Sequence, residues 1–261
     1  WEGPEEDLQL TENTQPAILT TSIAIYRVVA DKLAPPVAMA GHSLGEYSAQ
    51  VATGSLAFAD ALRLVKSRGR FMQEAVPPGQ GAMAAILGLD DEDVTTLCQQ
   101  NAAGEVLQAV NYNAPGQVVV AGTATAVGRL VENAKAAGAK RALQLPVSVP
   151  SHCALMQPAS DLMAERLNEV AISKGQTPVI HNVNVQTASD EAEVRQLLAR
   201  QISEPVRWVE TINSMKEMGV TQLIECGPGK VLCGLSKRIN RDMSCIPLIE
   251  KDSITSALEA E

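Results

Sequence analysis

Residues 37–54, VAMAGHSLGEYSAQVATG, constrain the fold more than any other part of the chain. A short apolar run typical of a buried parallel strand leads through Gly-x-Ser-x-Gly into a helical pattern. A serine between strand and helix is a nucleophile elbow, although Gly and Ser also occur together in plain tight turns. The glycines are expected where flanking side chains would clash. We therefore expect an α/β fold with Ser43 as nucleophile and the Leu44 N–H as an oxyanion donor.

Short apolar runs alternate with helical patterns along the rest of the chain. Residues 81–148 follow the order β-α-β-β-α-β of a split ferredoxin-like unit. The flanking patterns predict helices at 15–33, 58–76, 154–171, about 190–202 and about 207–218, and strands at 179–185 and 222–227. We predict an α/β-hydrolase-like parallel-sheet core formed by residues 1–79 and 149–261, discontinuous in sequence, with a ferredoxin-like α+β subdomain inserted at 80–148.

Composition narrows the class of protein. The chain has 261 residues, which suits one large domain or two closely packed ones. Apolar residues make up 46% but aromatic residues only 3%, so aliphatic side chains and methionine must fill the core. The formal net charge of −9 argues against nucleic acid or an anionic membrane as the partner.

Five cysteines are scattered without a C-x-x-C pair, which predicts reduced, mostly buried thiols and neither a disulfide framework nor a zinc site. No apolar run reaches the length of about 18 residues that would span a bilayer. No signal peptide is visible, although the chain opens at Trp1 rather than Met. We expect a cytoplasmic protein without metal or cofactor.

A nucleophilic serine needs a base, and the chain has three histidines. His42 adjoins Ser43 on a sharp turn, so its ring should point away from the hydroxyl and shape the pocket. His181 lies in an apolar run where a satisfied core histidine is the ordinary outcome. His152 lies where the predicted insert ends and the chain re-enters the α/β core, and it is our candidate base.

Arg68 is the most informative charged residue. The predicted helix 58–76 carries an apolar stripe at i, i+3, i+4 and i+7 spacing, and Arg68 falls on that stripe. A buried cation requires a carboxylate partner. Three explanations remain open at this point: a structural ion pair with an internal acid, a guanidinium that extends to the surface along its apolar stem, or a carboxylate that arrives with the substrate and is held by the planar guanidinium.

These residues together resemble the malonyl-CoA:acyl carrier protein transacylases, an acyltransferase family of fatty acid and polyketide synthesis. The matching segments, in family order over nearly the whole chain, are GHSLGEYSA, SRGRFMQEAVP, VNYNAPGQVVVAG, PVSVPSHCALM and ECGPGKVL. The resemblance implies transfer of a malonyl group from CoA to the phosphopantetheine thiol of acyl carrier protein through a malonyl-serine.

The resemblance also implies residue roles. Ser43 would carry the acyl group, His152 would be the base, and Arg68 would hold the malonyl carboxylate. Gln201 matches the position whose main-chain carbonyl orients the histidine. Two further residues would line the substrate pocket: Asn113 and, as a small residue that suits malonyl rather than methylmalonyl, Ser151.

The family's first strand and its Gly-Gln-Gly-Ser-Gln loop have no match here. Because that loop supplies a second oxyanion N–H, we expect a chain without it to lose about 10²–10³ in turnover. Two other classes remain open: a serine hydrolase, and a binding module with the fold but no turnover. Docking of an acidic carrier protein on a monomer would use exposed cations, for which the candidates are Lys66, Arg70, Lys230, Lys237 and Arg238. An ordinary solvated surface is the equal alternative for these residues.

Overall fold

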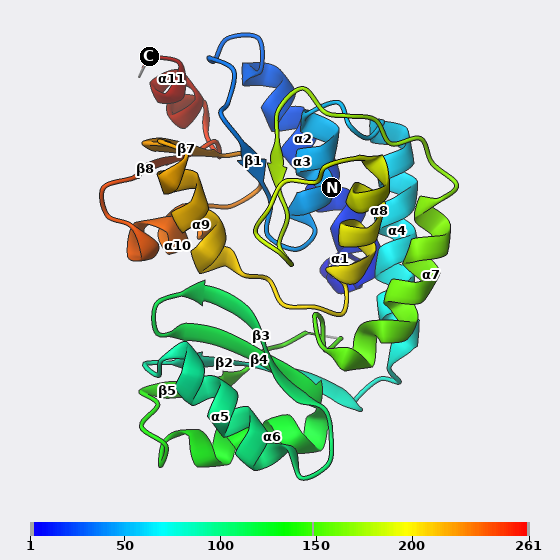
Figure 1. Ribbon diagram of the computed structural model, residues 1–261, viewed down its shortest axis with the longest axis vertical. Helices are drawn as coiled ribbons and strands as arrows, with labels where there is room; N and C mark the ends of the chain where they lie inside the picture. The colour runs from blue at the N-terminus through cyan, green and yellow to red at the C-terminus, as the bar shows by residue number, and fades with distance from the viewer. Residues whose placement is uncertain (1–2, 148, 260–261) are drawn as a thin grey trace.

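The computed structural model describes residues 3–147 and 149–259. Position 148, the last residue of the predicted insert, therefore lies outside the described residues, as does Trp1. Figure 1 shows a larger part that holds both ends of the chain and a smaller part built by the middle of the sequence. Within the described residues, every helix is too short or too polar to cross a membrane.

The larger part is organised around a short parallel strand pair. Strand β1 (Met39–Ala40) pairs with β6 (Val179–Ile180), and Met39 lies opposite Val179. Because the strands are parallel, the loops that follow them emerge at the same edge. A second parallel pair joins β7 (Gln222–Glu225) to β8 (Ser244–Pro247).

Helices cover these strands and contribute most of the apolar core. The main core cluster is built from aliphatic side chains of α2, α3, α4, α7 and α8. The helices of this part are α1 (Glu5–Gln9), α2 (Thr11–Val29), α3 (Gly45–Ala52), α4 (Phe58–Ala75), α7 (Gln157–Leu167), α8 (Glu191–Arg200), α9 (Trp208–Glu217), α10 (Val231–Ile239) and α11 (Lys251–Glu259). A 3-10 turn, Ala154–Met156, precedes α7.

The smaller part is a four-stranded antiparallel sheet with the order β3-β4-β2-β5. Its elements follow the sequence order β2 (Gly81–Leu87), α5 (Asp91–Ala102), β3 (Leu107–Ala114), β4 (Gln117–Thr123), α6 (Ala124–Ala134) and β5 (Arg141–Gln144). One face packs on α5 and α6 through residues such as Ile86 and Val120. The other face packs Met83 and Val119 against Cys153, which follows the point where the chain re-enters the larger part. The central strands β2 and β4 are therefore buried on both faces, whereas the edge strand β5 is mostly exposed.

Several boundaries differ from the sequence expectations, and α2 also ends at Val29 rather than at 33. Helix α2 begins at Thr11 and keeps Pro16 inside it, because packing against α4 stabilises the extra turn. A side-chain carbon at Gly69 of α4 would lie 2.5 Å from the Glu12 Cα of α2, so only glycine allows this approach. Strand β6 ends at Ile180 rather than at 185, and α7 ends at Leu167 rather than at 171.

The expectation that all cysteines are reduced is wrong. Cys233 of α10 forms a disulfide with Cys245 of β8. The two residues are 12 positions apart, and the β7–α10–β8 unit brings them together without a C-x-x-C spacing. Cys98 and Cys153 are buried free thiols, and burial raises the pKa of Cys98 to about 12 and that of Cys153 to about 11.

Candidate active site

The turn between β1 and α3 presents the Ser43 hydroxyl. Ser43 adopts a left-handed backbone conformation with φ of 52°, which costs a non-glycine residue about 1–3 kcal/mol and is found at functional sites. A side-chain carbon at Gly41 would lie 1.9 Å from the carbonyl carbon of Gly45, so position 41 requires glycine. A side-chain carbon at Gly45 would meet nothing within 4 Å. The expected steric need for glycine therefore holds at 41 and is wrong at 45.

His152 lies next to the serine in the orientation that a base requires. Its Nε2 atom is 2.8 Å from Ser43 Oγ, and its Nδ1 atom is 2.6 Å from the main-chain oxygen of Gln201. Because a carbonyl can only accept, Nδ1 carries the ring proton and Nε2 is left to accept the proton of Ser43. His152 also has a left-handed backbone, with φ of 67°. Both members of the pair are thus held in uncommon conformations.

His152 is neutral at ordinary pH. Its side chain is 2% exposed, and burial together with the nearby Arg68 guanidinium lowers its pKa to about 3. A neutral imidazole can take a proton from Ser43 without first losing one.

Arg68 reaches the reacting atoms from α4. It is 1% exposed, and its Nη2 atom donates to Ser43 Oγ at 3.1 Å and to Gln201 Oε1 at 2.6 Å. Its Nη1 atom donates to Gln15 Oε1 at 2.7 Å, whereas its buried Nε–H has no acceptor among the described residues. All its hydrogen-bond partners are neutral, and no described carboxylate forms a salt bridge with it. Burial lowers the pKa of Arg68.

The remaining predicted residues occupy different positions. Leu44 begins the first turn of α3, and among the described residues its N–H has no acceptor, as expected for a helix N-terminus. Asn113 accepts a 2.8 Å hydrogen bond from His42 Nε2 through its Oδ1 atom, and the His42 ring packs on Trp208 with centroids 5.6 Å apart. Ser151 precedes His152, and its N–H donates to the Val149 carbonyl.

Two polar residues at the site are missing from the sequence expectations. Gln15 is 5% exposed on α2, where it continues the buried line of Leu19 and Ile23, and a polar residue on such a line is the signal that could have identified it. Asn182 accepts from the Ser43 N–H at 2.7 Å, but its VIHNVNV context has the alternation of an ordinary strand. His181, beside it, bonds to the buried Glu46 carboxylate at 2.7 Å and is the satisfied core histidine expected from the sequence.

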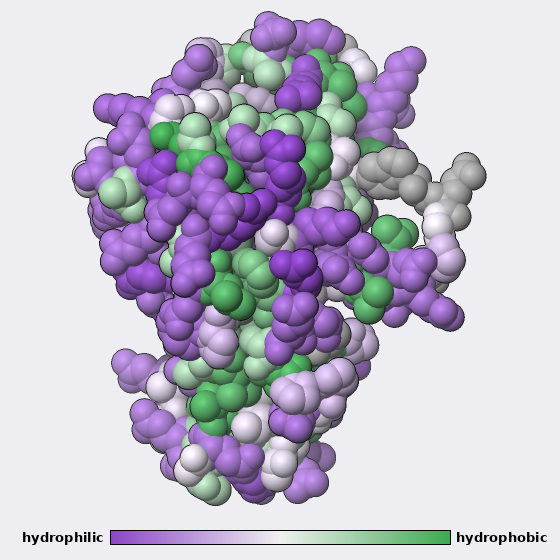
Figure 2. All heavy atoms as spheres, turned by 90° about the vertical axis from the view of Figure 1, so that its right-hand side faces the viewer, coloured by the Kyte–Doolittle hydropathy of each residue, from purple (hydrophilic) through white to green (hydrophobic). Residues whose placement is uncertain are grey.

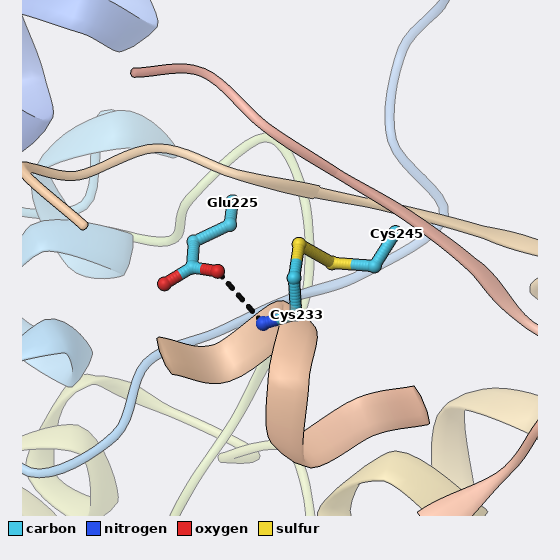
Figure 3. A group of neighbouring side chains, drawn as sticks. All are labelled: Glu225, Cys233 and Cys245. Carbon is cyan, nitrogen blue, oxygen red and sulfur yellow. Dashed lines mark hydrogen bonds between the residues drawn. A yellow bond between two sulfur atoms is a disulfide. The ribbon is translucent and has the colours of Figure 1, made fainter. Parts of the chain in front are cut away.

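One group of side chains in the described part of the chain has metal-ligand chemistry. Ligand atoms of Glu225, Cys233 and Cys245 lie within 4.8 Å of one another. Figure 3 shows that the two sulfurs are bonded to each other and that the Glu225 carboxylate accepts from the Cys233 N–H, at 2.7 Å. The second carboxylate oxygen accepts from Leu232 N at 3.0 Å. With the sulfurs oxidised and both carboxylate oxygens hydrogen-bonded, this group does not fit a metal ion.

A serine on a strand–turn–helix elbow, a neutral histidine oriented by a carbonyl, and a buried guanidinium define a serine acyltransferase type of site. The chain belongs to the acyl transferase domain family, whose model matches residues 1–252.

Relatives with known names agree with this assignment. The malonyl CoA-acyl carrier protein transacylase of Escherichia coli is 51% identical over 259 residues, which cover 99% of this chain and 84% of the relative. The Bacillus subtilis protein of the same name is 46% identical, over 99% of this chain and 82% of the relative.

Solved structures give the same result. An acyl carrier protein S-malonyltransferase from Vibrio cholerae superposes with a TM-score of 0.95 at 50% identity, covering 98% of this chain and 84% of that one. A malonyl-transacylase solved in complex with its type II polyketide synthase acyl carrier protein gives a TM-score of 0.97 at 51% identity, covering 100% of this chain and 84% of that one.

Proposed function

We propose that this enzyme transfers a malonyl group from CoA to the phosphopantetheine thiol of acyl carrier protein, in fatty acid biosynthesis, through a malonyl ester on Ser43. One observation carries the proposal: the Arg68 guanidinium is buried, has neutral hydrogen-bond partners and no salt bridge among the described residues, and lies 3.1 Å from the Ser43 hydroxyl. A cation in this position is suited to a substrate that brings its own carboxylate. The names of the relatives support the same substrates.

The first half-reaction begins at the Ser43–His152 hydrogen bond. His152 Nε2 takes the hydroxyl proton while Ser43 Oγ attacks the thioester carbonyl carbon of malonyl-CoA. The carbonyl oxygen becomes an oxyanion, for which the Leu44 N–H is the donor on the elbow. The carbon–sulfur bond then breaks, and the CoA sulfur takes the proton from His152. This leaves malonyl-Ser43, free CoA and a neutral His152.

In the second half-reaction the pantetheine sulfur is the nucleophile and Ser43 Oγ is the leaving group. His152 accepts the proton of the pantetheine thiol, and the sulfur attacks the ester carbonyl of malonyl-Ser43. When the ester bond breaks, Ser43 Oγ regains a proton from His152. Throughout both steps Arg68 holds the malonyl carboxylate, while Gln201 binds the guanidinium through its side chain and the imidazole through its carbonyl.

Two of the expected pocket residues have supporting contacts. Asn113 lies at the end of β3 and, through its bond to His42, joins the smaller part to the elbow. Ser151 immediately precedes the base, where a small side chain leaves space beside the acyl group. We assign both to the wall of the acyl pocket.

The same reasoning extends to the architecture. We propose that residues 1–79 and 149–261 form an α/β-hydrolase-like catalytic subdomain and that 80–148 form a ferredoxin-like one. The parallel pair β1–β6 and the strand order β3-β4-β2-β5 support this division. A monomer in the cytoplasm that needs no metal or cofactor remains our expectation.

We propose that the carrier protein docks near α10 rather than near α4. Lys66 and Arg70 project from α4 on the side opposite Arg68 and line a shallow hollow with Arg63 and Arg166. Figure 2 shows the side of the molecule that carries α4 and α7 as mostly hydrophilic, with separate small apolar areas.

Helix α10, in contrast, packs on β3, the strand that carries Asn113. Arg238 of this helix bonds to Gln117 at the start of β4. We therefore propose that the acidic carrier protein contacts Lys230, which precedes α10, and Lys237 and Arg238 in its last turn.

The fate of the acyl-enzyme tests the proposed function. Protein incubated with isotope-labelled malonyl-CoA should gain one malonyl group, located on Ser43 by mass spectrometry, and Ser43→Ala should gain none. The ester should persist in buffer and be released when a pantetheine thiol is added. Rapid release to water without thiol would instead identify a hydrolase, and the absence of any ester would overturn the mechanism.

A further inference from the structure

Asn182 is a fully buried residue, 0% exposed, with every polar group engaged. Its side-chain Oδ1 accepts from the Ser43 N–H at 2.7 Å, and its Nδ2 donates to the Gly41 carbonyl at 2.7 Å. Its main-chain N–H donates to Glu46 Oε2 at 2.9 Å, and its carbonyl accepts from the Arg207 N–H at 3.2 Å. A buried asparagine with this much hydrogen bonding is a structural clamp rather than a space filler.

The side-chain amide of Asn182 hydrogen-bonds to the elbow at both ends of its turn. Gly41 is the residue after β1, and Ser43 is the strained residue with φ of 52°. One planar amide therefore fixes a carbonyl and an N–H two positions apart, which sets the direction in which the Ser43 side chain leaves the backbone. The clamp also occupies the Ser43 N–H, so the next N–H, that of Leu44, is the one left for an oxyanion.

The clamp is itself held in place. Glu46 of α3 accepts from the Asn182 N–H with one carboxylate oxygen and from His181 Nδ1, at 2.7 Å, with the other. The turn after β6 is closed by bonds from the His181 N–H to the Gln186 carbonyl and from the Val185 N–H to the His181 carbonyl. Val185 is β-branched and has φ of 59°, a conformation that persists only where the surroundings determine it.

We infer that Asn182 is a positioning residue for acyl transfer, which holds the Ser43 backbone so that its Oγ faces His152 Nε2 and the Leu44 N–H faces the oxyanion. This inference rests on the proposed function of Ser43. The four hydrogen-bond partners of Asn182 all belong to the protein backbone or to Glu46, so the residue holds the elbow rather than the acyl group. Its loss should therefore change the rate of the chemical step rather than the affinity for malonyl-CoA.

Two substitutions separate the parts of the clamp. Asn182→Leu has a similar shape and removes both side-chain hydrogen bonds, whereas Asn182→Asp keeps an acceptor for the Ser43 N–H and loses the donor to Gly41. Asn184→Ala is the matched control, because Asn184 lies in the same turn and, among the described residues, its side chain hydrogen-bonds to the Gln186 N–H and not to the elbow. Circular dichroism and thermal unfolding establish that each variant is folded.

Three measurements follow on each folded variant. The first is the rate at which a fluorophosphonate labels Ser43, and the second is the single-turnover rate of malonyl-Ser43 formation. The third is the Kd of malonyl-CoA, measured with Ser43→Ala in the background so that no ester forms. We expect Asn182→Leu to slow both rates by about 10–100-fold, because small displacements of a reacting group have effects of this size. Asn182→Asp should be slowed less, while Asn184→Ala should match the wild type and every Kd should stay within about threefold.

The inference is overturned if folded Asn182→Leu labels and loads at wild-type rates, or if its Kd rises by the same factor as its rate falls. If Asn182→Leu does not fold, Asn182→Asp decides the question by the same criteria. Failure of the proposed function gives a different result: the wild type would then be labelled by the fluorophosphonate but would form no malonyl ester.

Discussion

Arg68 Nη2 donates to Ser43 Oγ at 3.1 Å, so a buried cation touches the atom that is to carry the acyl group. The same nitrogen donates to the side-chain oxygen of Gln201, whose main-chain oxygen orients His152. The proposed nucleophile, base and carboxylate-binding group therefore share one hydrogen-bonded cluster. A substitution at one of these residues should therefore affect the other two.

Replacing Arg68 should change which acyl group is loaded. A hydrogen bond from a charged donor contributes about 1.5–3 kcal/mol, so Arg68→Ala should lower kcat/KM for malonyl loading by roughly 10–150-fold. Loading of acetyl, which brings no carboxylate, should fall much less. Competition between malonyl-CoA and acetyl-CoA, followed by mass spectrometry of the acylated protein, measures the ratio. Equal losses for both substrates would contradict a carboxylate-binding role.

Ester formation should depend little on pH between 5 and 8. His152 has a pKa near 3 in the folded protein, because burial and the Arg68 guanidinium disfavour its charged form, and His42, which also faces it, has a lowered pKa too. The base is therefore neutral throughout this range. Single-turnover loading rates should stay within about threefold, whereas a tenfold loss per pH unit below 6.5 would show an ordinary histidine.

The same pKa shift predicts the direction of acid destabilisation. The unfolded chain binds a proton at His152 below its ordinary pKa of 6.5, and the folded chain does not do so until about 3. Between these values the unfolded state holds more protons, so His152 lowers the free energy of unfolding as pH falls, by at most about 1.4 kcal/mol per pH unit. Urea unfolding of wild type and His152→Gln at pH 7 and pH 5 should show a smaller acid loss in the variant.

The two elbow glycines should respond oppositely to alanine. Gly41→Ala places a carbon 1.9 Å from the backbone of Gly45 and should cost at least about 1–3 kcal/mol of unfolding free energy. Gly45→Ala enters open space at a helical position and should stabilise the fold by roughly 0.4–1 kcal/mol. Denaturant unfolding measures both, and similar destabilisation by the two variants would contradict the steric account.

The disulfide should stabilise the C-terminal unit. Cys233 and Cys245 close a short loop, and loops of about 15 residues contribute roughly 3 kcal/mol in the chain-entropy account. Cys233→Ser should lower the unfolding free energy by about 2–3 kcal/mol relative to the oxidised wild type. Reductant should lower the stability of the wild type to the same level and leave the variant unchanged. If reductant leaves the unfolding free energy of the oxidised wild type unchanged, this prediction is wrong.

Charge reversal should locate the carrier-protein surface. The double substitution Lys237→Glu with Arg238→Glu should slow malonyl transfer to carrier protein by about tenfold at low salt and leave loading from CoA unchanged, because exposed charges act mainly on encounter. The matched control is Lys66→Glu with Arg70→Glu on α4, which should change neither step. A larger effect from the α4 pair would place docking on the other side of the molecule.

Local patterns predict part of this site well. The elbow follows from an apolar run, two glycines and a helical pattern, and the burial of Arg68 follows from the apolar stripe of its helix. The roles of Gln201 and Asn113 are implied only by the family resemblance. For Gln201 the reason is that every residue has a main-chain carbonyl, so no sequence pattern indicates which one orients the histidine. These are long-range contacts between segments that the fold, not the local pattern, brings together.

Other features cannot be predicted from local sequence patterns. Residues 179–185 alternate as a strand does, but the chain leaves the sheet after Ile180, and the left-handed backbone at Val185 has no signal in a β-branched residue. Asn182 was missed with that turn. The Cys233–Cys245 bond depends on how β7, α10 and β8 pack, since its spacing matches no common motif.

The acceptor that orients His152 is a peptide oxygen and not a carboxylate. No substitution at position 201 can delete this atom, and no pH change in the physiological range can protonate it. A variant such as Gln201→Ala would remove the side-chain bonds to Arg68 and to the Ser43 carbonyl but would keep the carbonyl that aligns the imidazole. The enzyme thus offers a route to redesigning its acyl preference without rebuilding its base.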